Sequence, residues 1–274
     1  MPAQKLLRSF LLLAFFSAIP GYAFAVNFYD GVRAPKGHYL LTYFSYYTAD
    51  KTTDADGVVN NNNYNYRKHE EIIRYCYYSP DLVLTALIPR GYVHSGAYHS
   101  SSQGIGDINL GAGYFLPVKM ADILPALFVK LRNGSYDSGK LVNYGTNQYD
   151  IKPTVFLYKA LGRFSIDGAA KYYFRTQNQA TKVSPGNELY LQCLLGWQFN
   201  RMLKAGPSFN WMQSTSQISN GTRVSGSKRE SLSIGADMYL RLPIAGVTFT
   251  YLRDIHSKNT TRGDFFQIKT TCKF

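Results

Sequence analysis

Long apolar runs are missing from this chain beyond its first 25 residues. No stretch of about 18 or more apolar residues follows Val26, which excludes membrane-spanning helices. Nevertheless, 45% of the residues are hydrophobic, with 23 Tyr and 17 Phe, while the mean hydropathy is only -0.21. The apolar residues are therefore dispersed, as they are in strands that show only every second side chain to lipid.

Cysteine is scarce, and the histidines are scattered. The three cysteines are Cys76, Cys193 and Cys272. An odd number without a C-x-x-C pair or zinc-type spacing favours free thiols over a disulfide framework. The histidines show no ligand spacing either, so we predict neither a metal site nor a cofactor.

Blocks of Lys and Arg of the kind that bind nucleic acid are also absent, although the formal net charge is +13. Lys5 and Arg8 lie in the first 25 residues, and without them 28 basic residues face 17 acidic ones, a net charge of +11. The phosphates of lipopolysaccharide, or an anionic solute, are therefore better candidate partners than nucleic acid.

The first 25 residues have the pattern of a secretory signal peptide. Lys5 and Arg8 precede a short apolar stretch, and an Ala-Phe-Ala sequence ending at Ala25 forms a cleavage site before Val26. We therefore expect two parts, a signal peptide over residues 1–25 and an exported domain over residues 26–274.

The end of the chain alternates strictly between apolar and polar side chains. One phase holds Phe266, Ile268, Thr270, Cys272 and Phe274, and the other holds Gln267, Lys269, Thr271 and Lys273. Alternate side chains of a strand point to opposite faces, so one face of this strand would meet lipid. A final strand that ends on Phe274 also resembles the closing strand of bacterial outer-membrane barrels, which implies the barrel-assembly machinery as a partner.

The same alternation recurs along most of the chain and defines twelve strand candidates. They are residues 37–47, 64–78, 82–94, 103–116, 126–133, 144–159, 164–175, 187–199, 203–212, 227–240, 244–253 and 265–274. Long polar loops follow the odd-numbered candidates and short turns follow the even-numbered ones. Outer-membrane barrels sort their loops in this way, whereas a soluble β-sandwich has no reason to do so. We therefore predict a closed antiparallel transmembrane β-barrel of about 12 strands in the outer membrane.

Aromatic residues near the segment ends are typical of the girdles at the two membrane surfaces. The residues assigned to these girdles are Tyr43, Tyr47, Tyr114, Tyr158, Trp197, Phe199, Trp211 and Phe274.

The polar phase would line the lumen. Its predicted pore-lining residues are Asp107, Lys130, Arg132, Asp150, Lys152, Asp167, Lys171, Arg175, Glu188, Lys204, Arg229 and Asp237, with Lys269 and Lys273 on the last strand. Two interpretations stay open: a wet lumen with a positive potential, or acids and bases that pair across strands and fill the barrel. The adjacent Ile72 and Ile73 leave the phase of one strand ambiguous, so Glu70, Glu71 and Arg74 are not assigned.

Catalytic groups are sparse. His99 and Ser101 give the His-x-Ser spacing, and outer-membrane phospholipases use a His-Ser pair on a twelve-stranded barrel. Here the two residues lie in a Ser-rich loop without an orienting third group, which nucleophilic catalysis requires. We therefore predict that the protein is not an enzyme.

One motif resembles a known family. Residues 87–92 read Leu-Ile-Pro-Arg-Gly-Tyr, and residues 103–114 read Gln-Gly-Ile-Gly-Asp-Ile-Asn-Leu-Gly-Ala-Gly-Tyr. A proline-containing segment followed by Gly-x-Gly-Asp and a glycine-rich strand resembles the outer-membrane proteins of the MetA-pathway of phenol degradation family. The resemblance implies a barrel for the uptake of aromatic or other hydrophobic small molecules and brings no catalytic residues. From its own neighbourhood, Asp107 is expected to fix a bend between loop and strand.

These observations predict an outer-membrane channel or transporter for the passive uptake of a small solute, aromatic or hydrophobic. Two alternatives remain: an anion-preferring channel for acidic saccharides, and a non-conducting barrel that acts in structure or adhesion through its loops.

Overall fold

The computed structural model of the protein describes residues 25–61 and 63–274. The predicted signal peptide lies outside the described residues, apart from Ala25 at its end, so the division of the chain at that point stays a prediction. Within the described part of the chain, no helix is long and apolar enough to cross a bilayer.

Residues 25–61 and 63–274 form seventeen β-strands. They are β1 (Gly37–Thr53), β2 (Val59–Asn60), β3 (Tyr66–Tyr78), β4 (Leu82–Ser95), β5 (Ser100–Ile105), β6 (Asn109–Tyr114), β7 (Asp122–Lys130), β8 (Asp150–Leu161), β9 (Phe164–Arg175), β10 (Val183–Ser184), β11 (Glu188–Gln198), β12 (Leu203–Ser214), β13 (Ile218–Ser219), β14 (Thr222–Arg223), β15 (Glu230–Arg241), β16 (Gly246–Lys258) and β17 (Thr261–Lys273).

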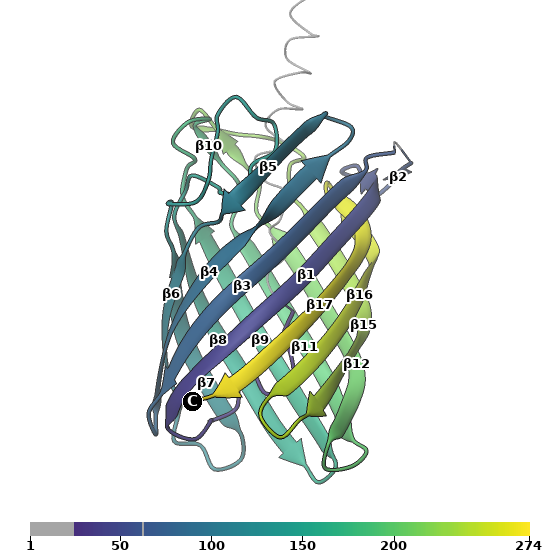
Figure 1. The fold of residues 1–274 in the computed structure, drawn as a ribbon. Helices are drawn as coiled ribbons and strands as arrows, with labels where there is room; N and C mark the ends of the chain where they lie inside the picture. The colour runs from purple at the N-terminus through teal and green to yellow at the C-terminus, as the bar shows by residue number, and fades with distance from the viewer. Residues whose placement is uncertain (1–24, 62) are drawn as a thin grey trace, which may run out of the picture.

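The strands close into a barrel (Figure 1). The main sheet has 14 strands, of which β2 is a short addition to β1, and β5 and β6 share one position beside β4. Twelve positions therefore surround the lumen. Each neighbouring pair is antiparallel, and β17 pairs with β1 over a register that runs from Tyr39 opposite Lys273 to Thr52 opposite Thr261. The predicted closed twelve-stranded barrel is confirmed.

Alternation explains which face of each strand meets lipid. Exposed apolar side chains follow every second position, for example Leu191 and Leu195 of β11, while Tyr190 and Leu194 on the other phase are buried inside. In an aqueous protein such a continuous apolar belt would be costly, and in a bilayer it is the surface that lipid requires. The belt and the closed sheet identify an outer-membrane barrel, as the sequence predicted.

Several strands are longer than their alternation predicted. The loops expected over 48–63 and 254–263 are partly strand, because β1 and β16 continue beyond the apolar belt and remain paired with their neighbours. Inner residues of these extensions are polar and buried, as where the Thr53 hydroxyl donates to the Ser257 hydroxyl at 3.2 Å. The three short strands β10, β13 and β14 form a separate small sheet that the sequence analysis did not predict.

One predicted strand is interrupted. Residues 103–116 divide into β5 and β6, with a break at Asp107. Pro89 of β4 lies opposite this break and has no N–H to donate to a ladder, while its carbonyl accepts the Gly106 N–H at 2.8 Å. Proline is tolerated in sheets at such irregular places.

Three of the aromatic assignments were wrong. Tyr43 and Tyr47 are buried on the inner face of β1, and the ring of Tyr158 contacts the ring of Tyr29 inside the barrel, with 5.7 Å between centroids. Tyrosines occupy both phases of these strands, so position near a strand end does not distinguish an anchor in the membrane surface from a luminal side chain. The other five lie on the outer phase or beyond a strand end: Tyr114, Trp197, Phe199, Trp211 and Phe274.

The lipid-facing belt can be tested with a charge. Val155 lies on the outer phase near the middle of β8, so Val155→Arg should lower the free energy of unfolding from lipid vesicles by about 2–4 kcal/mol. The matched control is Val58→Arg, in the exposed loop between β1 and β2, which should change it by less than about 0.5 kcal/mol. Equal effects of the two substitutions would contradict the placement of the belt.

Candidate channel lumen

The N-terminal segment, residues 25–36, runs along the inside of the barrel. Ala25 packs with Tyr47 and Val142 at the level of the long loops, and Arg33 reaches the turn between β3 and β4. The Asn27 side-chain amide donates to Asp237 Oδ2 at 3.1 Å and to a threonine hydroxyl of β16 at 2.9 Å. The Tyr29 N–H donates to Asp167 Oδ1 at 2.7 Å. These acceptors belong to β15, β16 and β9, so the segment is attached to the wall on more than one side.

Two ion pairs hold the same segment. Asp30 pairs with Lys269 of β17, and Arg33 pairs with an aspartate in the turn between β3 and β4. Burial alone would raise the pKa of Asp30, but the Lys269 ammonium and the Asn27 N–H outweigh it and hold that pKa below its ordinary value. The pair therefore contributes stability that is complete above the ordinary carboxyl pKa and is lost only as the pH falls through the lowered value.

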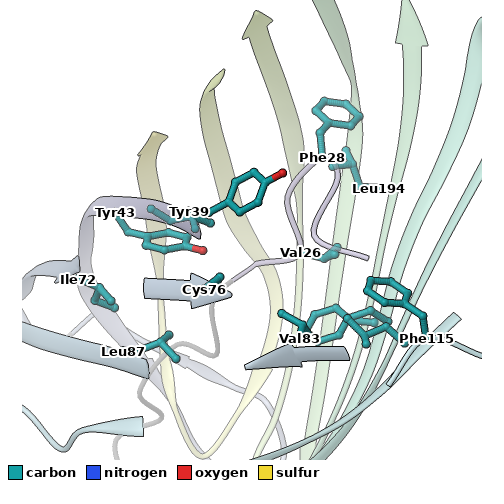
Figure 2. Close-up of a cluster of buried hydrophobic side chains, with 14 residues drawn as sticks. Val26, Phe28, Tyr39, Tyr43, Ile72, Cys76, Val83, Leu87, Phe115 and Leu194 are labelled. Carbon is teal, nitrogen blue, oxygen red and sulfur yellow. The ribbon is translucent and has the colours of Figure 1, made fainter. Parts of the chain in front are cut away.

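Apolar packing completes the attachment. Val26 and Phe28 are each only 1% exposed and belong to the main buried cluster. Figure 2 shows Phe28 beside Leu194 of β11. The Lys204 ammonium lies 4.6 Å from the centre of the Phe28 ring and 4.3 Å from that of Tyr29, a favourable cation–π arrangement. The segment thus closes the lower lumen with both apolar and polar contacts.

Higher in the lumen, a chain of charged side chains connects neighbouring strands. Every member is at most 9% exposed at its side chain. In order, the contacts are Asp107 to Lys130 at 3.8 Å, Lys130 to Asp150 at 2.8 Å, Asp150 to Arg175 at 3.8 Å, Arg175 to Glu188 at 2.7 Å, and Glu188 to Arg229 at 2.5 Å. We call this chain the ionic ladder. Acids and bases alternate along it, so each charge that folding buries has an opposite neighbour.

Asp107 also attaches the loop between β7 and β8 to the broken strand. One carboxylate oxygen accepts the Gly134 N–H at 2.8 Å, and the other accepts the Thr146 N–H at 2.8 Å and the Thr146 hydroxyl at 2.6 Å. The Ser135 N–H donates to the Ile105 carbonyl at 2.7 Å. Asp107 therefore fixes a bend between loop and strand. The loop covers the edge of β5 that is not paired with another strand of the sheet.

A cavity of about 180 Å³ lies between the N-terminal segment and the ionic ladder. Its apolar and aromatic lining consists of Tyr43, Ile72, Leu87, Pro89, Phe128, Tyr144, Phe156 and Tyr173. Its charged lining consists of Asp30, Lys68, Glu70, Arg74, Asp107, Lys130, Asp150, Lys152, Lys171, Arg175 and Glu188. The lining is therefore amphipathic, since charged groups and aromatic rings share the walls of the cavity.

The predicted pore-lining residues divide into four groups. Seven line the cavity: Asp107, Lys130, Asp150, Lys152, Lys171, Arg175 and Glu188. Asp167, Lys204 and Asp237 lie lower, against the N-terminal segment. Arg229 ends the ionic ladder. Arg132 is elsewhere: β7 ends at Lys130, and the exposed Arg132 side chain lies over the outer ring of Tyr149 at 5.4 Å.

Four charged residues of the cavity were missed by the sequence analysis: Asp30, Lys68, Glu70 and Arg74. Three of them lie on β3, whose phase the adjacent Ile72 and Ile73 obscured. Ile72 is 2% exposed and faces the lumen, whereas Ile73 is 56% exposed and faces lipid. The pairing of Ile72 with the luminal Tyr43 decides the phase, and that pairing is not visible in the sequence.

The candidate chemical groups outside the lumen are not gathered into a site. His99 is an exposed turn residue with a φ of 46° between β4 and β5, and Ser101 is an exposed residue of β5 that pairs with His94 of β4. Among residues 25–61 and 63–274, no three His, Cys, Asp or Glu side chains are arranged to hold a metal ion.

A family model described as "Putative MetA-pathway of phenol degradation" matches residues 49–270, which is most of the barrel. The chain belongs to this family. The resemblance noted around residues 103–114 is thereby confirmed. A search of curated proteins finds no match.

Solved structures place this family member among outer-membrane barrels. The COG4313 outer membrane channel from Pseudomonas putida F1 is similar with a TM-score of 0.83 and 16% identity, over 91% of this chain and 100% of that one. The NanC porin is similar with a TM-score of 0.54 and 10% identity, over 86% of this chain and 100% of that one. The β domain of the Bordetella autotransporter BrkA is similar with a TM-score of 0.52 and 10% identity, over 88% of this chain and 100% of that one. At identities this low, the likeness is one of fold.

The ionic ladder can be tested at its most connected acid. Glu188→Gln removes the charge that Arg175 and Arg229 share, and should lower the free energy of unfolding by about 3–5 kcal/mol, because two buried guanidinium groups lose the carboxylate nearest to them. Urea unfolding in vesicles, followed by tryptophan fluorescence, measures the change. The same substitution at the exposed Glu71 on the outer phase of β3 should change it by less than about 0.5 kcal/mol, and a similarly small loss at Glu188 would show that the ladder adds no stability.

Proposed function

We propose that the protein is a passive outer-membrane channel for small hydrophobic solutes, aromatic ones among them. The observation that carries the proposal is the luminal cavity, in which Phe128, Phe156 and Tyr173 form part of the wall inside a closed barrel. A structural barrel would be expected to fill this space with side chains, because packed interiors leave few voids larger than a water molecule.

Family membership supports the same function, and the fold it shares with the COG4313 channel is compatible with it. An acidic-saccharide channel is the weaker alternative. The basic surplus that suggested it is largely neutralised, because Lys130, Arg175 and Arg229 belong to the ionic ladder and Lys269 pairs with Asp30. Adhesion and lipid hydrolysis have no comparable group of residues in their favour.

The N-terminal segment is the barrier on the periplasmic side. Val26 and Phe28 are buried within the lumen, so a solute that leaves the cavity towards the short turns has to displace them. The polar contacts of the segment are few, chiefly those of Asn27, Tyr29, Asp30 and Arg33 with the wall. Displacement therefore requires no rearrangement of the barrel itself.

A larger side chain on β3 can fill the cavity, because the luminal and lipid-facing positions of this strand are known. Ile72→Trp places a larger side chain in the lumen and should reduce both single-channel conductance in planar bilayers and the flux of phenol into proteoliposomes several-fold. Ile73→Trp, on the same strand but facing lipid, is the control and should leave both unchanged, since this side chain lies outside the lumen. If the wild-type protein neither conducts nor transports, the proposed function is wrong.

The barrier can be loosened separately. Asp30→Asn breaks the ion pair of the N-terminal segment with Lys269 and should increase the open probability or the conductance, because the segment is then less firmly held. Asp56→Asn, in the exposed loop between β1 and β2, is the matched control in the same bilayer recordings. An unchanged open probability in Asp30→Asn would mean that the segment does not limit the current.

A further inference from the structure

The cavity wall carries basic side chains that are not paired with an acidic one, unlike the bases of the ionic ladder. Each acid on its wall is already committed to a base: Asp30 to Lys269, Glu70 to Lys68 at 2.8 Å, and the others within the ionic ladder. Two bases, Arg74 and Lys152, form no ion pair within the described part of the chain.

Neutral groups hold both of these bases in place. Arg74 Nε donates to the Thr85 hydroxyl at 2.9 Å, and its Nη1 donates to the Tyr43 hydroxyl at 3.3 Å. Lys152 Nζ donates to Asn109 Oδ1 at 2.8 Å. A guanidinium has five N–H donors and an ammonium has three, so each base keeps donors for a further acceptor. Both side chains thus line the cavity with neutral hydrogen-bond partners and with no carboxylate of the described residues at ion-pair distance.

The aromatic wall lies next to these bases. The Lys152 ammonium is 4.7 Å from the centre of the Tyr173 ring, and the rings of Phe128 and Phe156 meet edge to face with 6.4 Å between centroids. An apolar ring in the cavity would contact these side chains, while a negative group attached to it would reach a cation. The volume of about 180 Å³ suits one ring with a small substituent, since a cavity of about 150 Å³ is enough for benzene.

From these contacts we infer that the cavity selects a small aromatic anion, a single ring that carries a carboxylate. This inference rests on the proposed channel function and narrows its solute. A neutral hydrocarbon would leave Arg74 and Lys152 desolvated without a counter-ion, which is costly in a confined space. A disaccharide acid would supply the charge but exceeds the volume and meets rings where its hydroxyl groups need partners.

Three probes separate charge from ring. Benzoate has both, benzamide has the ring at the same size without the charge, and acetate has the charge without the ring. The apparent dissociation constant of each follows from the concentration dependence of transient current block in single-channel recordings. We expect benzoate to bind at least about tenfold more tightly than benzamide or acetate, which corresponds to about 1.4 kcal/mol.

Variants on opposite faces of two strands locate the effect. Arg74→Gln and Lys152→Gln should each reduce the preference for benzoate over benzamide about tenfold, with little change for benzamide itself. The controls are Arg67→Gln on β3 and Lys159→Gln on β8, whose positions belong to the outer phase of the same strands. These controls should retain the wild-type preference.

The outcomes distinguish this inference from the proposed function. A wild-type channel that conducts but blocks equally with benzoate and benzamide overturns the inference and leaves the channel intact, whereas a protein that neither conducts nor blocks overturns both. If the preference for benzoate persists in both Arg74→Gln and Lys152→Gln, the cavity is not the site that selects benzoate. The wild-type comparison of the three probes needs no variant to fold, and heat-modifiable mobility on gels reports whether each variant has assembled.

Discussion

The pairing of β1 with β17 is the constraint on which the rest of the molecule depends. Lipid offers backbone N–H and C=O groups no partner, and each unpaired group costs several kcal/mol. An open sheet of these strands would carry two unpaired edges through the bilayer. The long register between the first and last strands removes both edges, and it can form only when every strand between them is in place. Closure therefore also determines which side chains share the lumen.

Once the sheet is closed, the inner phase of every strand faces the inner phases of the others across a narrow space. Charged residues placed there lose water, and each needs an opposite charge or a hydrogen-bond partner to offset that loss. The ionic ladder meets this requirement near the long loops, and the contacts of the N-terminal segment meet it near the short turns. The two interpretations left open by the sequence thus apply to different levels of one lumen: charges pair at both ends, and space remains between them.

Where the sequence was sufficient, the alternation was uninterrupted. β9 has the predicted bounds because its twelve residues alternate without exception. The break at Asp107 was not predictable from the alternation of residues 103–116, because it depends on Pro89 of the neighbouring strand and on a loop that binds the Asp107 carboxylate from residues 134 and 146. The phase of β3 likewise depends on pairing across strands. Periodicity therefore predicted the barrel and most of its luminal side chains, whereas contacts distant in sequence decided the composition of the cavity.

The distribution of charge in the lumen also explains how one fold can combine stability with selectivity. A charge that is paired within the wall cannot discriminate between solutes, because its field is cancelled by its neighbour at short distance. Selectivity must come from the charges that remain. Arg74 on β3 and Lys152 on β8 both line the cavity, and neutral side chains hold them there. Because threonine, tyrosine and asparagine orient these two cations without cancelling them, the barrel keeps its buried network intact while leaving a positive potential beside aromatic rings.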